Sequence, residues 1–158
     1  GQMLGRFLAD VVALHPKGTL ILAGTNDVAH GVKPAAIADN LVMMGEIAKM
    51  HNVQPMFASL LPVSQARAKD RPVETLKQIN QWIRDYCIRE SFIYVDYYTA
   101  MVDASGFIKA DLSDDGLHPN AKGYRVMAPL AQGAVERLGI MLSEETDTTR
   151  RRGTTTKK

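Results

Sequence analysis

The sequence lacks the features that mark several specialised classes of protein. Its single cysteine, Cys87, excludes an internal disulfide framework and a cysteine-rich zinc site. It contains no run of about 18 apolar residues, so no transmembrane segment is predicted. The first residues do not combine a basic region with a long apolar one, so they are not a signal peptide. The compartment stays open, because a full-length form could be secreted or periplasmic.

The chain also lacks an excess of charge on its globular part. The net charge of +2 comes from the last 18 residues, which contain five basic and three acidic side chains. The remaining residues 1–140 carry 14 basic and 14 acidic side chains. A nucleic-acid partner is therefore not expected, because it would need a basic face on the fold itself.

Signals for a metal or an organic cofactor are missing as well. The four histidines show no spacing typical of metal ligands: His15, His30, His51 and His118. No glycine-rich or Ser/Thr-rich loop that could cradle a phosphate follows a predicted strand, which argues against a flavin or nucleotide binder. We expect neither a metal nor a cofactor.

Hydrophobic residues make up 46% of the chain, enough for one core. Their spacing predicts helices over residues 3–14, from Pro34, from Pro72 and over 121–138, short strands over 19–23, 55–61 and 92–95, and mostly loop over 99–120. A helix followed by three strand–helix units is typical of a parallel sheet with helices on both faces, the α/β class. We expect one domain, residues 1–140, and a low-complexity tail, residues 141–158.

Two polar clusters follow predicted strands, at the edge where open parallel sheets bind ligands. In the second cluster, Asp114-Asp115-Gly116-Leu117-His118-Pro119-Asn120, the Asp115 carboxylate can reach back to the His118 ring and orient it as a general base. A plain Asp-Gly turn beside a helix start is the alternative interpretation.

The first cluster, Gly24-Thr25-Asn26-Asp27, directly follows the strand predicted over 19–23. There the Asn26 side-chain amide could donate a hydrogen bond to a developing oxyanion. The alternative is a simple turn, with Asp27 capping it or the next helix.

Together the two clusters resemble the SGNH (GDSL) hydrolases. Gly24–Asp27 is similar to block III of that family and Asp115–Asn120 to its block V, and the resemblance covers roughly residues 2–140. It implies a flavodoxin-like three-layer α/β/α fold and hydrolysis of a small acyl-ester or lipid-like substrate. The implied roles are general base for His118, its orienting partner for Asp115 and oxyanion donor for Asn26, with Gly24 and Thr25 in the substrate-binding surface.

The sequence departs from the family in lacking the Gly-Asp-Ser motif that carries the nucleophile. Ser59 is near the right edge of the sheet but is a poor candidate, so the nucleophile stays unknown. We expect an N-terminally truncated member in which strand 19–23 is an exposed edge that supports self-association. The alternative function is an inactive remnant that self-associates or only binds esters.

Two further segments are expected to line the cleft, the loop 64–71 and residues 102–113. The basic side chains of the first are Arg67, Lys69 and Arg71, and a solvated face is the favoured interpretation for them.

Overall fold

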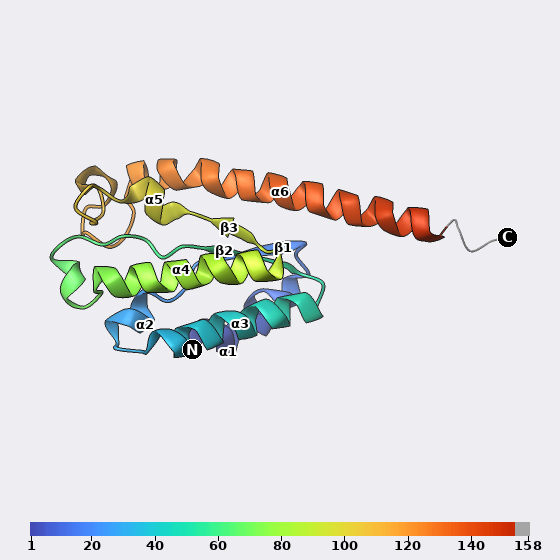
Figure 1. The fold of residues 1–158 in the computed structure, drawn as a ribbon, viewed down its shortest axis with the longest axis horizontal. Helices are drawn as coiled ribbons and strands as arrows, with labels where there is room; N and C mark the ends of the chain where they lie inside the picture. The colour runs from blue at the N-terminus through green and yellow to red at the C-terminus, as the bar shows by residue number, and fades with distance from the viewer. Residues whose placement is uncertain (154–158) are drawn as a thin grey trace.

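The computed structural model describes the backbone of residues 1–153 and the side chains of residues 1–144. A three-stranded parallel sheet of order β1-β2-β3 lies between two layers of helices (Figure 1), which confirms the predicted α/β class. The elements are α1 Gln2–Asp10, η1 Val12–Leu14, β1 Gly18–Ile21, α2 Thr25–Ala29, α3 Pro34–Met50, β2 Gln54–Ala58, η2 Arg67–Lys69, α4 Val73–Glu90, β3 Ile93–Val95, α5 Tyr97–Met101, η3 Ala110–Leu112 and α6 Ala121–Gly153.

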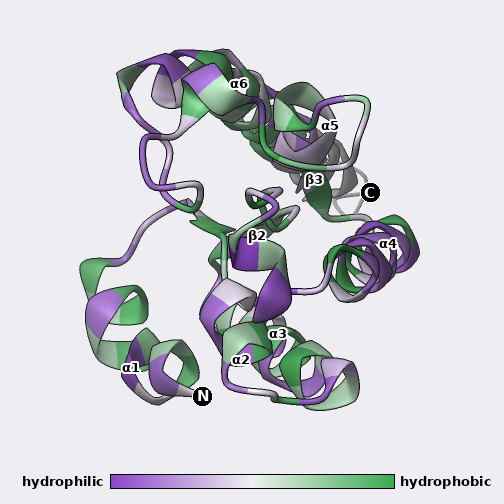
Figure 2. Cartoon of the chain, turned by 90° about the vertical axis from the view of Figure 1, so that its left-hand side faces the viewer, coloured by the Kyte–Doolittle hydropathy of each residue, from purple (hydrophilic) through white to green (hydrophobic). Residues whose placement is uncertain are grey.

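The two helical layers follow from the direction in which the chain crosses the sheet. The chain moves one way from β1 to β2 to β3, so right-handed crossovers put α3 and α4 on the same face, and α6 covers the other (Figure 2). Side chains of the central strand alternate accordingly. Phe57 packs in the core cluster on the α3 and α4 side, whereas Met56 and Ala58 pack in the cluster that contains residues of α6.

Two of the helices, α3 and α4, begin at the prolines from which the sequence predicted them to start. Pro34 is in the first turn of α3, and Pro72 immediately precedes α4. The helix predicted over 3–14 is present as α1 and the short η1, which ends where His15 adopts a left-handed conformation with φ of 50°.

The second strand is shorter than predicted, because its continuation pairs with a side chain. Ser59 still donates its backbone N–H to Val95 O, at 3.0 Å. At Leu60 the backbone N–H and C=O are instead bonded by the buried side chain of Asn80, at 2.6 and 3.0 Å. The backbone of residues 60–63 therefore leaves the ladder while its side chains remain buried.

Residues 99–120 are mostly loop, as predicted, whereas the prediction that the last helix ends near 138 needs correction. The helical parts of residues 99–120 are the end of α5 and the short η3, and α6 continues to Gly153. The apolar pattern stops near 142, but a helix satisfies its own backbone groups and needs no buried face to continue. The domain boundary at 140 stays a prediction, and residues 154–158 of the predicted tail lie outside the described residues.

Strand β1 is an edge of the sheet, as expected. Among the described residues it pairs only with β2, in the register Gly18 with Gln54 through Ile21 with Phe57. Helix α1 lies on the α3 side of the sheet (Figure 2), and its Phe7 is buried in the same core cluster as Ile21 of β1.

Candidate functional site

The loop before α6 brings the Asp115 carboxylate and the His118 imidazole into direct contact. Asp115 Oδ2 lies 2.7 Å from His118 Nδ1. The other oxygen, Oδ1, accepts the backbone N–H groups of Leu117 at 2.9 Å and His118 at 2.8 Å. Because an ionised carboxylate only accepts, the ring proton is assigned to Nδ1, which leaves the Nε2 lone pair free.

This network stabilises the charged form of Asp115. The hydrogen bond from the His118 side chain, followed by those from the backbone N–H groups of His118 and Leu117, holds the pKa of Asp115 well below its usual range. The His118 side chain itself is 77% exposed, so its free nitrogen is accessible to a reacting group.

Sequence reasoning missed two serines that support this loop. Ser113, which is buried, donates its hydroxyl to Asp115 Oδ1 at 3.2 Å. Ser64 donates its backbone N–H to Gly116 O at 2.8 Å. Gly116 has a φ of 74°, and a Cβ there would collide with the Ser64 hydroxyl. A serine two residues before an aspartate is too common a pattern to have indicated the first contact, and the second joins distant segments.

Asn120 explains why the loop ends where it does. Its Oδ1 accepts the backbone N–H groups of Lys122 at 2.9 Å and Gly123 at 3.2 Å, which caps α6. Its amide nitrogen donates to Asp114 Oδ1 at 2.8 Å. The loop that contains His118 is thus tied to the start of a long helix.

The Gly24–Asp27 cluster is the start of the short helix α2 and not a simple turn. Gly24 has a φ of 127°, and a Cβ there would lie 3.1 Å from Ile37 Cγ2. Asp27 does not cap a helix; its Oδ1 lies 3.4 Å from the Gly1 α-ammonium. Asn26 lies in α2, which follows the edge strand β1 after the connection 22–24, as the sequence predicted.

The Asn26 side chain is bonded on one side only. Its Oδ1 accepts a hydrogen bond from Arg71 Nη2 at 3.4 Å, and its backbone carbonyl lies 2.7 Å from His30 Nδ1. Within the described part of the chain, its Nδ2 group has no hydrogen-bond partner, so this amide is a free donor.

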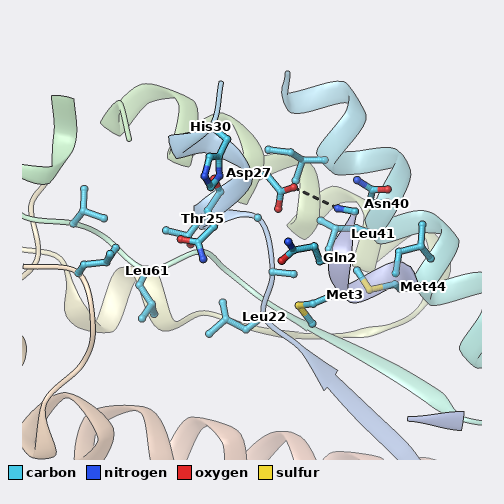
Figure 3. A pocket seen from close by; sticks show the side chains of 18 of the residues that line it. Gln2, Met3, Leu22, Thr25, Asp27, His30, Asn40, Leu41, Met44 and Leu61 are labelled. Carbon is cyan, nitrogen blue, oxygen red and sulfur yellow. Dashed lines mark hydrogen bonds and ion pairs between the residues drawn. The ribbon is translucent and has the colours of Figure 1, made fainter. Parts of the chain in front are cut away.

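A cavity of about 570 Å³ is lined by residues of both clusters. Figure 3 shows the side of this cavity where Thr25 and Asp27 of the first cluster lie near Gln2, Met3 and Leu41. Asn26 and His118, together with the predicted substrate-binding residues Gly24 and Thr25, all line it. Asp115 is not in its wall and reaches it through His118. The apolar part of the wall comes from α1, α3 and the segments after β1 and β2: Met3, Leu4, Leu22, Ile37, Leu41, Met44, Leu61 and Val63.

The segments predicted to line this cavity do not do so. Its wall contains no residue of 64–71 or 102–113. The solvated interpretation also fails for Arg71, which is buried, whereas Arg67 and Lys69 are exposed.

No serine lines the cavity either, among the residues that the structure describes. Ser59 is fully buried, and its hydroxyl accepts the backbone N–H of Tyr98 at 2.8 Å. This hydrogen bond therefore joins the segment after β2 to the start of α5, which follows β3. Cys87 is also buried, which raises the pKa of its thiol to about 12 and keeps it neutral.

In the described part of the chain, no three His, Cys, Asp or Glu side chains come together in a way that could hold a metal ion. None of the described helices combines the length and apolarity needed to cross a bilayer.

Comparison with protein families assigns the class of protein that this fold and site define. The GDSL-like Lipase/Acylhydrolase family matches residues 1–126. The chain belongs to this family, whose members are hydrolases. A search of curated proteins found no significant match.

Solved structures agree with this assignment. A GDSL-like lipase from Bacteroides thetaiotaomicron is 30% identical, covers 86% of this chain and 70% of its own, and superposes with a TM-score of 0.80. The lipase/acylhydrolase from Enterococcus faecalis is 23% identical over 86% of this chain and 68% of its own, with a TM-score of 0.72. A catalytic mutant of an acetylxylan esterase from Geobacillus stearothermophilus is 18% identical over 85% and 66%, with a TM-score of 0.71. The last two show a shared fold alone.

Proposed function

We propose that the chain carries the base and oxyanion parts of a serine ester hydrolase site that acts by Ser-His-Asp acyl transfer. His118 is the general base and then the general acid, Asp115 orients it, and Asn26 donates to the oxyanion. Gly24 and Thr25 bind the substrate. The observation that carries the proposal is the single cavity lined by both Asn26 and His118, with His118 held by Asp115 at 2.7 Å.

The chemistry follows from the free atoms. His118 Nε2 takes the proton of a serine hydroxyl as its oxygen attacks the ester carbonyl carbon. The negative charge that develops on the carbonyl oxygen is stabilised by the Asn26 Nδ2 donor. The protonated ring then gives its proton to the departing alkoxide, and water repeats the sequence to release the carboxylic acid. Asp115 stays ionised throughout and stabilises the positive ring.

The apolar wall supports a small acyl-ester or lipid-like substrate. Leu22, Leu41 and Met44 can surround an acyl chain, and the cavity of about 570 Å³ is of the size usual for small-molecule sites. The names of the solved relatives, a lipase, a lipase/acylhydrolase and an acetylxylan esterase, are consistent with an ester bond as the target.

The nucleophile is the missing part. The sequence contains no Gly-Asp-Ser, and no described serine lines the cavity. This favours a second candidate function, in which the chain by itself is inactive and only binds esters or their products, or self-associates.

Esterase activity tests whether the chain holds its own nucleophile. We expect the purified chain to hydrolyse p-nitrophenyl acetate no faster than its His118→Ala variant, because loss of a triad member typically costs on the order of 10⁴–10⁶ in rate. A clear drop in the variant, or a covalent adduct in the intact mass after treatment with a fluorophosphonate, would reveal a nucleophile within this chain.

Product binding tests the remaining site. Butyrate, a short carboxylate product, is titrated into ¹⁵N-labelled protein. We expect shifts of the Asn26 side-chain amide and the His118 ring signals, and loss of binding in Asn26→Ala and His118→Ala. If butyrate shifts neither the Asn26 amide signal nor the His118 ring signals, the cavity is not an acyl-transfer site.

A further inference from the structure

Arg71 is a buried cation with very few partners. It directly precedes Pro72 and α4, and only 9% of it is exposed. Burying a guanidinium is costly unless it is paired. Yet among the described residues no carboxylate forms an ion pair with it, and its Nε has no hydrogen-bond partner. Burial of the Arg71 guanidinium therefore lowers the stability of the fold, and no ion pair offsets this cost.

The hydrogen bond that its side chain makes is with Asn26. Arg71 Nη2 donates to Asn26 Oδ1 at 3.4 Å. A guanidinium can only donate hydrogen bonds. It therefore favours the orientation of the neighbouring amide in which Oδ1 points toward the guanidinium and Nδ2 points away. A nearby positive charge also polarises that amide, which makes its N–H groups stronger donors.

The segment that contains Arg71 also reaches the other cluster. Ser64 donates its N–H to Gly116 O at 2.8 Å, and Arg67 Nε donates to Asp115 O at 3.2 Å. The Arg71 N–H in turn donates to Arg67 O at 3.2 Å. One short segment thus contacts the backbone beneath His118 and the side chain of Asn26.

We propose that Arg71 is a positioning residue that fixes the Asn26 amide with its Nδ2 donor toward the reacting oxygen. Arg71 does not line the cavity, so it acts through Asn26 and does not touch substrate. The proposal rests on the proposed function, because it gives Asn26 an oriented donor to present. It also assigns a role to a side chain outside the two recognised clusters.

The Asn26 side-chain amide reports directly on this contact. Its ¹H–¹⁵N signal is identified by its loss in Asn26→Asp. We expect Arg71→Met to move and broaden this signal, because both orientations of the amide become populated. Lys69→Met is the matched control, since Lys69 is exposed, lies in the same segment and loses the same charge. It should leave the Asn26 signal in place.

Butyrate affinity supplies the second measurement. We expect Arg71→Met to bind butyrate on the order of tenfold more weakly than the parent. Arg71→Lys keeps the charge but not the fork of donors, so it should still displace the Asn26 signal and restore only part of the affinity. If Arg71→Met does not fold, as judged by the backbone amide spectrum, Arg71→Lys carries the same test.

Two results would overturn the proposal. One is an Asn26 signal that is unchanged in folded Arg71→Met. The other is full affinity and an unchanged signal in Arg71→Lys, which would make the charge alone responsible. Failure of the proposed function gives a different result. Butyrate then shifts neither the Asn26 amide signal nor the His118 ring signals in the parent protein, whatever effect the Arg71 variants have on the amide.

Discussion

Among the individual residues, Asp115 depends most clearly on ionisation for its interactions. Its carboxylate accepts from the His118 ring and from the backbone N–H groups of Leu117 and His118. These bonds lower the pKa of Asp115 in the folded protein. A carboxyl group with a lowered folded pKa contributes stability above its unfolded pKa of about 3.9 and loses it as the pH falls below that value.

We therefore expect Asp115→Asn to lower the free energy of unfolding at neutral pH, with a difference from the parent that shrinks below about pH 4. Urea unfolding at a series of pH values measures this difference. Asp39→Asn, an exposed position on α3, is the control and should differ little from the parent at any pH. A difference for Asp115→Asn that is constant down to pH 2 would contradict the assignment of these bonds to the carboxylate.

Gly116 is the residue on which the loop geometry depends. Its φ of 74° disfavours a side chain, and a Cβ would overlap the Ser64 hydroxyl. We expect Gly116→Ala to lower the free energy of unfolding by about 2 kcal/mol, measured by urea denaturation. Gly139→Ala is the matched control, since a Cβ at that helical position meets no atom within 4 Å and should stabilise by up to about 1 kcal/mol. Equal effects of the two changes would be evidence against the strained loop.

At the scale of elements, Asn80 joins α4 to the segment after β2. Its amide satisfies both backbone groups of Leu60 where the ladder ends, at 2.6 and 3.0 Å. Removing it leaves buried polar groups without partners, each costing about 1–3 kcal/mol. We expect Asn80→Ala to destabilise the protein by about 3 kcal/mol in urea unfolding.

The neighbouring Gln81 is the control for this prediction. Its amide donates to Asp85 on the exposed side of α4, at 2.8 Å. We expect Gln81→Ala to change the unfolding free energy by no more than about 0.5 kcal/mol. If both variants were equally mild, the Leu60 groups would have to find other partners.

At the scale of the whole molecule, the edge strand β1, which pairs only with β2 among the described residues, bears on association. The strand is four residues long, has no charged side chain and is only half-buried over Gly18–Leu20. Unpaired backbone groups of this kind are a template for pairing with another chain. We propose that copies of the chain associate through this edge, and expect light scattering to find a species larger than the monomer.

A charged residue placed on this strand tests the route of association. Lysine at an edge opposes strand pairing, so Thr19→Lys should shift the scattering mass toward the monomer. Lys122→Thr, on the exposed side of α6, is the control and should leave association unchanged. A parent protein that is already a monodisperse monomer would rule out the edge as an interface.

Sequence alone determined the features that depend on short-range chemistry. Apolar spacing and prolines located the strands and the longer helices, and the Asp115–His118 pair was predicted because three residues suffice for the carboxylate to reach the ring. The alternation of elements predicted the parallel sheet and hence the edge at which Asn26 and His118 line one cavity. The lack of Gly-Asp-Ser was also visible from the start.

Only the tertiary structure decided which distant side chains support those residues. Arg71 beside Asn26, Asn80 around Leu60 and Ser64 under Gly116 each join segments that no periodicity relates. Such contacts depend on how the layers pack, because a polar group that is buried must find whatever partner the fold brings to it. For the same reason a loop arginine that was predicted to face solvent is buried behind the site.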